Sequence, residues 1–157
     1  MKIALTGHRP ERLGTNTKEI KNWIKETLLS ENATEVYCGM ADGGDILLAL
    51  AVIELKRQYH YNIKLNCILP CKNYGRRNEN YNYIKENADS WIELQDKYTK
   101  DCNSKRDLYM VEHCDKLIAL WDKLKVGGVY NTINMAKERN KEIIYCPVIK
   151  EGVWKKM

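Results

Sequence analysis

The sequence contains no apolar run that approaches the roughly 20 residues a membrane-spanning helix needs. Its first ten residues, MKIALTGHRP, become polar too early for a secretory signal, so we expect a cytoplasmic protein without a membrane partner. Internal repeats, low-complexity tracts and linkers rich in proline, glycine or serine are also absent. Because 157 residues is a usual length for one domain, we expect a single domain over residues 1–157.

Several enzyme and metal motifs are missing as well. The chain has no GxxxxGK[ST], GxGxxG, GxSxG or HExxH motif, which argues against the corresponding nucleotide-binding enzymes, hydrolases and zinc proteases. The six cysteines do not form paired zinc-finger spacings, and Cys38, Cys67 and Cys146 fall in apolar segments. We therefore expect reduced structural thiols, and neither a metal nor a cofactor.

Positive charge is modest and dispersed. Lysine and arginine exceed the acidic residues enough for a net charge of +5, but only Lys72, Arg76 and Arg77 cluster in the sequence. Neither a basic stripe for duplex binding nor a basic groove rich in aromatic residues for single-stranded DNA is evident. A small anionic ligand is therefore expected rather than a nucleic acid.

Short apolar runs alternate with segments of helical periodicity. The runs predict strands over 3–6, 35–38, 63–69, 116–121 and 142–146. The periodic segments predict helices over 17–29, 45–57, 79–88, 104–113 and 130–140. Residues 70–103 are the least defined, and SWIEL within them could form a short extra strand. The alternation predicts an α/β fold with a doubly wound, mainly parallel sheet flanked by helices.

Ligands of open parallel sheets bind beyond the carboxyl ends of the strands, so the loops at those ends carry the candidate site. In the first loop, TGHRP, Gly7 allows a sharp turn or close approach to a ligand, while His8 and Arg9 supply donors. A turn glycine beside a solvated arginine explains the same residues equally well.

The second loop is CGMADGGD. Gly39 ends a strand, and Gly43 and Gly44 come just before an apolar helix, where backbone N–H groups would be free to bind an anion. Asp42 or Asp45 could accept a ribose hydroxyl. For Asp45 alone, an ordinary helix cap is the interpretation we favour.

The third loop places two glycines before a helix that opens with small polar side chains. We expect a phosphate cradle rather than a plain turn, because the pattern occurs twice in the chain. The residues concerned are Gly127, Gly128, Tyr130, Asn131 and Thr132.

Two other candidates lie near these loops. Arg106 stands at the start of the helix over 104–113 and could neutralise a phosphate, although a surface arginine is the simpler interpretation. Trp121 or Tyr130 could stack on a base, and Trp121 could equally belong to the core.

Four motifs, TGHRPERLG, GMADGGD, KRDLYMVEHCDKLIALWD and GGVYNTINMAKERNKEI, together resemble the YspA-type family of the SLOG superfamily, named after DprA/Smf and LOG proteins. The resemblance spans most of the chain. It implies a Rossmann-like domain that binds or processes nucleotides and nucleotide-derived molecules. The residues that match the family's site are Gly7, His8, Arg9, Gly39, Met40, Ala41, Asp45, Arg106, Gly127, Gly128, Asn131 and Thr132.

The chain departs from LOG enzymes at the third loop. Those enzymes remove a base from a nucleoside monophosphate with the glutamate of a PGGxGTxxE motif, whereas the segment VYNTINMA has no acid. Glu138 follows only about two helical turns later. We therefore favour a non-catalytic protein that senses or sequesters an ADP-ribose-like or cyclic nucleotide signal, as in phage or bacterial defence. The alternative is a nucleotide hydrolase acting on an N-glycosidic or phosphate bond, with Asp42 or Asp45 as acid or base.

The resemblance also implies a homo-oligomer, because SLOG proteins resemble one another in forming dimers or larger assemblies. The apolar helix over 45–57, with Trp91 or Trp154, could supply the contact. Packing within one chain would explain the same residues.

Overall fold

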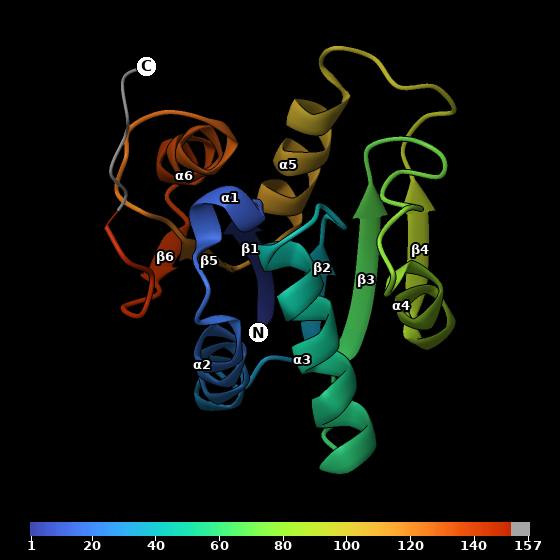
Figure 1. Ribbon diagram of the computed structural model, residues 1–157, viewed down its shortest axis with the longest axis vertical. Coiled ribbons are helices and arrows are strands. Elements are labelled where there is room, and N and C mark those ends of the chain that lie inside the picture. The colour runs from blue at the N-terminus through green and yellow to red at the C-terminus, as the bar shows by residue number, and fades with distance from the viewer. Residues whose placement is uncertain (152–157) are drawn as a thin grey trace.

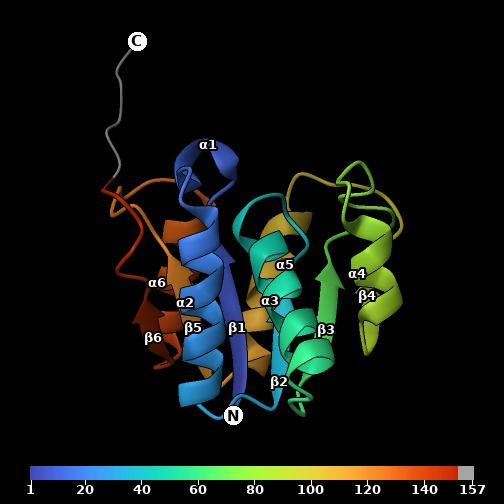
Figure 2. The ribbon, with the colours of Figure 1, turned by 60° about the horizontal axis from the view of Figure 1, so that its bottom comes forward.

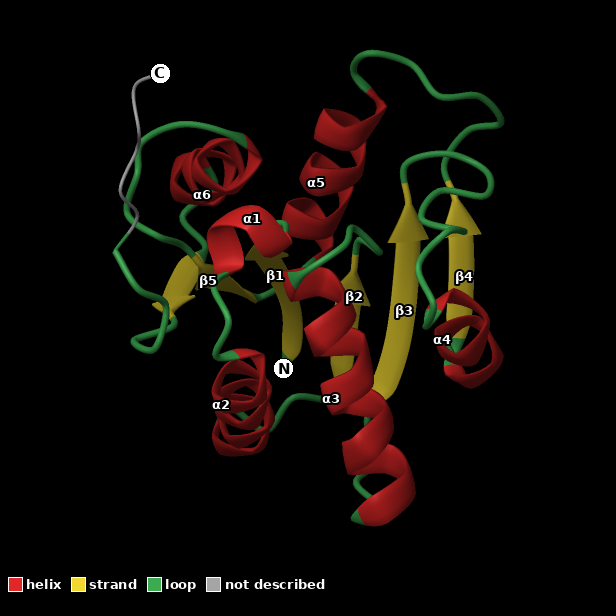
Figure 3. Cartoon of the chain, viewed as in Figure 1, coloured by secondary structure: helices red, strands yellow, loops and turns green. Residues whose placement is uncertain are grey.

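The computed structural model describes residues 1–151 and places one sheet between two layers of helices (Figures 1 and 3). The strands are β1 Lys2–Gly7, β2 Glu35–Cys38, β3 Lys64–Leu69, β4 Ser90–Glu93, β5 Lys116–Leu120 and β6 Glu142–Tyr145. The helices are α1 Pro10–Leu13, α2 Thr17–Ser30, α3 Gly44–Gln58, α4 Tyr81–Asn87, α5 Cys102–His113 and α6 Gly128–Glu138.

The sheet has the strand order β4-β3-β2-β1-β5-β6, and every neighbouring pair is parallel. The chain moves outward from β1 to β4 and then returns to place β5 on the other side of β1. Figure 2 shows α2, α3 and α4 in front of the sheet and α5 and α6 behind it. This is the predicted α/β, doubly wound architecture. Its order reverses between β1 and β5, the position where such sheets bind ligands.

Strand β1 shows how the sequence builds a core on both faces of the sheet. Ile3 and Leu5 pack in the cluster that contains α2 and α3, whereas Ala4 packs in the cluster that contains α5. All three side chains are fully buried. Apolar residues at consecutive positions are what a parallel strand covered on both faces requires.

The predicted elements differ from the observed ones mainly at their ends. SWIEL contributes β4, the edge strand beside β3. We expected both glycines of the third loop to precede the last helix. The helix instead begins at Gly128, and only Gly127 precedes it, as the N-cap. Helix α1 was not predicted, because four residues that start with a proline show no periodicity.

The residues nominated for a contact between subunits pack within the chain. Most of α3 is buried in the core, and Trp91 meets Tyr81 edge-on with 5.2 Å between ring centroids. Trp154 lies outside the described residues. Homo-oligomerisation therefore stays a prediction without a surface assigned to it.

The six cysteines are free thiols, and all are buried, as expected of structural residues. Within residues 1–151, no helix combines the length and apolar character needed to cross a membrane.

Candidate functional site

Two neighbouring cavities lie at the carboxyl ends of the strands. The first, here called the arginine cavity, measures about 550 Å³ and is lined by Arg9, Met40, Asp42, Asn73, Tyr74, Gly75, Arg76 and Arg77. The second, here called the carboxylate cavity, measures about 400 Å³, and its polar lining includes His8, Arg9, Glu11, Arg12, Asp45, Asn103, Arg106 and Asp107. Because Arg9 lines both cavities, they are adjacent, and we treat them together as one candidate site.

The structure brings several of the nominated residues together. Gly7, His8, Arg9, Asp45, Arg106 and Gly128 line the carboxylate cavity. Met40 and Asp42 lie with Arg9 in the arginine cavity. The remaining nominated residues line neither cavity: Gly39, Gly43, Trp121, Gly127, Tyr130, Asn131 and Thr132.

His8 is buried at the end of β1 and accepts a hydrogen bond there. With the ring neutral and Nε2 unprotonated, the backbone N–H of Asp122 donates to Nε2 over 3.0 Å. Burial lowers the pKa of His8, although the Asp122 carboxylate, 3.2 Å from Nε2, opposes the shift. We expected His8 to act as a donor, but Nε2 instead joins the ends of β1 and β5.

Arg12 in α1 holds the loop between β5 and α6. Its Nε and Nη2 donate to the two carboxylate oxygens of Asp122 over 2.8 and 2.7 Å, and Nη1 donates to the Val126 carbonyl over 3.0 Å. Burial alone would raise the pKa of Asp122, but the hydrogen bonds from Arg12 and the Leu124 amide outweigh it, so the pKa is lowered. Sequence reasoning missed this pair, although Asp122 directly follows a predicted buried strand.

Glycines in the first two loops let backbone pack on backbone. A Cβ on Gly44 would lie 2.9 Å from Gly7 Cα, and a Cβ on Gly43 would lie 2.4 Å from the His8 carbonyl oxygen. The Gly44 N–H donates to that same oxygen over 3.0 Å, so this amide is not free to bind an anion, contrary to our expectation. The geometry explains the second loop's glycine pair by close packing.

Asp45 is not the cap that we favoured from the sequence. Gly43 is the N-cap of α3, without a side-chain cap hydrogen bond, and Asp45 lies within the first helical turn. Its Oδ2 accepts the Ala41 N–H over 3.1 Å. Its side chain is therefore placed at the carboxylate cavity rather than at the helix end.

Arg106 lies among buried polar groups. Its Nε donates to Asp107 Oδ1 over 2.7 Å, and its Nη1 donates to the Gly39 carbonyl. Gly39 provides the space, because a Cβ there would lie 2.9 Å from Asp45 Oδ2 and 3.0 Å from Arg106 Cζ. With 5% of its surface exposed, Arg106 is not the surface arginine of the simpler interpretation.

The two carboxyl groups beside Arg106 resist ionisation. Burial raises the pKa of Asp45 to about 6, even though Arg106 lies nearby, and burial also raises the pKa of Asp107. Burial opposes the charge on Arg106, but Asp107 and Asp45 outweigh it and raise the pKa of the guanidinium. A permanent cation therefore lies between two acids that titrate above their usual range.

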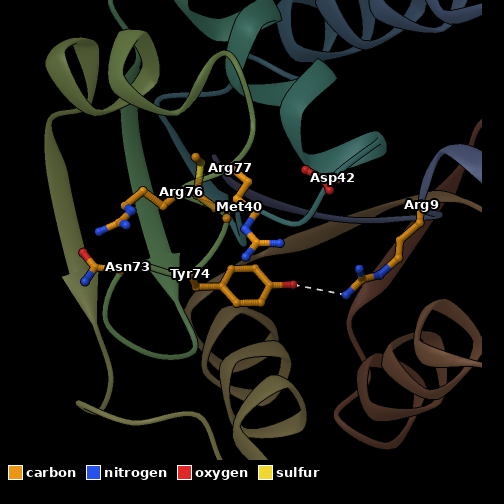
Figure 4. Close-up of a pocket in the computed structure, with 8 residues that line it drawn as sticks. Arg9, Met40, Asp42, Asn73, Tyr74, Arg76 and Arg77 are labelled. Carbon is orange, nitrogen blue, oxygen red and sulfur yellow. Dashed lines mark hydrogen bonds between the residues drawn. The ribbon is translucent and has the colours of Figure 1, made fainter.

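Tyr74 lines the arginine cavity and contacts arginines of both cavities. Arg9 Nη2 donates to its hydroxyl over 3.3 Å, and the Arg106 guanidinium carbon lies 5.6 Å from its ring centroid. Figure 4 shows Arg9 and Arg77 extending toward Tyr74, whereas Arg76 points away from it. Sequence reasoning did not nominate Tyr74 because residues 70–103 lack periodicity; the cluster of basic residues there was the available signal.

The third loop presents Gly128 to the carboxylate cavity. A Cβ on Gly128 would meet no atom within 4 Å, whereas one on Gly127 would lie 2.9 Å from Arg12 Nη1. The Thr132 hydroxyl donates to the Gly128 carbonyl over 2.8 Å, within α6. Among the nominated residues of this loop, only Gly128 is therefore accessible to a ligand in the carboxylate cavity.

The aromatic candidates lie together, away from the lining of both cavities. Trp121 stacks on Tyr130 with 6.1 Å between ring centroids, and its Nε1 donates to the Leu124 carbonyl over 2.9 Å. Tyr74 is instead the aromatic ring that lines the arginine cavity.

Comparison with known proteins supports the fold and the family. A search of curated proteins gives no significant match. Among solved structures, DNA processing protein A from Helicobacter pylori, described as binding single-stranded DNA, matches with a TM-score of 0.67 and 18% identity. The match covers 94% of this chain and 65% of that chain, so this chain spans less than two thirds of that protein. The model of the YspA SLOG family matches residues 3–150, and the chain therefore belongs to this family.

Proposed function

We propose that this protein binds a nucleotide-derived small molecule across the two cavities and senses or sequesters it without turnover. The observation that carries the proposal is that Arg9 lines both an arginine-rich cavity and a neighbouring cavity that contains the carboxyl groups of Asp45 and Asp107. Guanidinium groups bind phosphates, and carboxylates accept hydrogen bonds from sugar hydroxyls. Both volumes fall within the roughly 300–1,000 Å³ usual for small-molecule sites.

The arginine cavity is the better phosphate site of the two. It contains three arginines and one aspartate, and Asp42 already accepts a hydrogen bond from the Asn78 side chain over 3.0 Å. Arg9 and Arg77 can reach a phosphate between them. An ADP-ribose-like molecule or a cyclic nucleotide carries both the phosphate and the ribose that this arrangement suits.

The first turn of α6 supports binding without turnover. It contains no acidic residue, so the LOG-type catalytic glutamate has no counterpart there. A ligand held at Gly128 would therefore meet no acidic side chain from the first turn of α6.

Calorimetry against ADP-ribose, cyclic dinucleotides, AMP and a single-stranded oligodeoxynucleotide tests the proposal. We expect binding of at least one small nucleotide, and a loss of roughly 10- to 100-fold in affinity for Arg77→Gln, as for a hydrogen bond to a charged group. Arg57→Gln is the control, because Arg57 lies at the far end of α3 and bonds Asn87. Binding of the oligonucleotide alone, or equal affinities of the two variants, would contradict the proposal.

A hydrolase remains the second candidate because of one observation. Asp45 lines the carboxylate cavity with a pKa raised by burial to about 6, which suits a general acid near neutral pH. Chromatography of nucleotides incubated with the protein would reveal released base or phosphate, and Asp45→Asn should abolish the release. Nucleotides recovered intact after long incubation would eliminate this candidate.

A further inference from the structure

We infer that the two cavities divide the ligand, with phosphate in the arginine cavity and ribose in the carboxylate cavity, so that the protein selects ribonucleotides over 2′-deoxyribonucleotides. The inference rests on the proposed function and adds the ligand class. Asp45 and Asp107 are the specificity-determining residues.

Charge separates the two cavities. The arginine cavity has a surplus of cations, whereas the carboxylate cavity balances Arg9, Arg12 and Arg106 against Glu11, Asp45 and Asp107. Arg106 is moreover engaged by Asp107 and the Gly39 carbonyl. A phosphate entering the carboxylate cavity would meet the buried carboxyl group of Asp45 and the half-buried one of Asp107, so the favourable place for it is beside Arg9 and Arg77.

The carboxylate cavity also contains acceptor oxygens that have no donor or only a weak one. Asp45 Oδ1 accepts no hydrogen bond from any residue within 1–151, and Asn103 Oδ1 is buried without a partner. Asp107 Oδ2 lies 3.3 Å from the Thr132 hydroxyl, whose shorter contact is to the Gly128 carbonyl. A buried acceptor such as Asn103 Oδ1 requires a donor. A ligand in the cavity would provide one to it and to the unoccupied oxygens of the two carboxyl groups.

Ribose hydroxyls are the donors that fit both the acceptor oxygens and the charge balance of the carboxylate cavity. They are neutral, so Arg106 does not repel them as it would repel an ammonium group. Two adjacent hydroxyls can donate to carboxyl groups that face the same space from α3 and α5. An exocyclic amine of a base is the competing neutral donor, and the experiment separates the two.

One ligand can span the two cavities because they share their boundary. Arg9 lines both, while Ala41 lines the carboxylate cavity and the next residue, Asp42, lines the arginine cavity. A phosphate linked directly to a ribose therefore requires no other group to connect the two sites.

The test measures the affinities of AMP, 2′-deoxy-AMP and IMP for the wild-type protein by calorimetry. We expect AMP to bind roughly 10- to 100-fold more tightly than 2′-deoxy-AMP, because a carboxylate loses its donor. IMP, which lacks the exocyclic amine but keeps both hydroxyls, should bind like AMP. The inference would be overturned if AMP and 2′-deoxy-AMP bound with equal affinity. It would also be overturned if IMP bound more weakly than AMP while 2′-deoxy-AMP did not.

The variant Asp107→Ala tests the specificity directly, because loss of ribose selection and structural damage change the two affinities differently. We expect the preference for AMP over 2′-deoxy-AMP to fall below about 3-fold in this variant, whereas structural damage would weaken both ligands equally. Asp101→Ala, at the exposed N-cap position of the same helix, should keep the wild-type preference. If the variant does not fold, the wild-type comparison still decides.

The outcomes also separate this inference from the proposed function. If ADP-ribose or a cyclic nucleotide binds while AMP does not, or binds without a ribose preference, only the inference fails. If no nucleotide binds, the proposed function fails, and the inference fails with it.

Discussion

At the residue scale, Asp45 links the site to the stability of the fold. Its pKa is raised by burial to about 6 from an unfolded value of 3.8, so the folded state binds its proton more tightly. Its contribution to stability is fully present below about pH 3.8 and is lost as the pH rises through about 6. The ionised form at neutral pH is stabilised by Arg106 and the Ala41 amide.

We therefore predict that the wild-type protein loses about 1 kcal/mol of unfolding free energy relative to Asp45→Asn between pH 5 and pH 8, given about 1.4 kcal/mol per pKa unit. Urea denaturation of both proteins at each pH measures the difference. His8 has the opposite dependence, because its pKa is lowered and its contribution is lost as the pH falls below 6.5. Both proteins keep His8, so its contribution cancels in the difference between them. Parallel pH profiles of the two unfolding free energies would contradict the prediction.

At the element scale, α3 and α6 both begin with a glycine, but the two glycines have different surroundings. A Cβ on Gly44 would lie 2.9 Å from both Gly7 Cα and Leu120 Cδ1, while one on Gly128 would meet no atom within 4 Å. We predict that Gly44→Ala destabilises the protein by about 1–3 kcal/mol, the usual cost of overpacking. Gly128→Ala should be neutral or slightly stabilising, because alanine favours helix. Thermal denaturation compares the pair, and similar losses in both would contradict the packing argument.

The same pair shows what the sequence could and could not predict. Glycine before a helix marked both loops, and apolar runs that alternate with helical segments located the sheet, because burial on both faces leaves a clear pattern. The pattern did not distinguish a glycine needed for packing, Gly44, from one open to the cavity, Gly128. That difference depends on Gly7, which lies far away in the chain.

Residues whose role comes from tertiary contacts were the ones missed. Arg12 and Asp122 pair across 110 positions of sequence, and Tyr74 meets Arg9 across 65. Neither pairing leaves a periodic signal, and Tyr74 belongs to a segment without regular structure. Asp107, beside the nominated Arg106, was missed because adjacent helical residues do not ordinarily face the same ligand.

At the scale of the whole molecule, the candidate site joins the two halves of the sheet. The carboxylate cavity takes residues from β1 and α3 on one side of the strand-order reversal and from α5 and α6 on the other. A ligand bound there contacts both halves, so it should stabilise them together. This coupling follows from the topology, because the loops meet only when β5 returns beside β1.

Two tryptophans report on different core clusters of the molecule. Trp23 packs against the cluster of α2 and α3, and Trp121 packs against the cluster of β5 and α6. In variants that keep one of them, with the other tryptophans changed to Phe, we predict coincident unfolding transitions, as two-state behaviour requires. AMP at about 100 times its Kd should raise the unfolding free energy by about 2.7 kcal/mol at both probes. Arg77→Gln at the same AMP concentration should show a smaller shift. A shift at only one probe would show that the ligand binds within one half, contrary to a site shared by both.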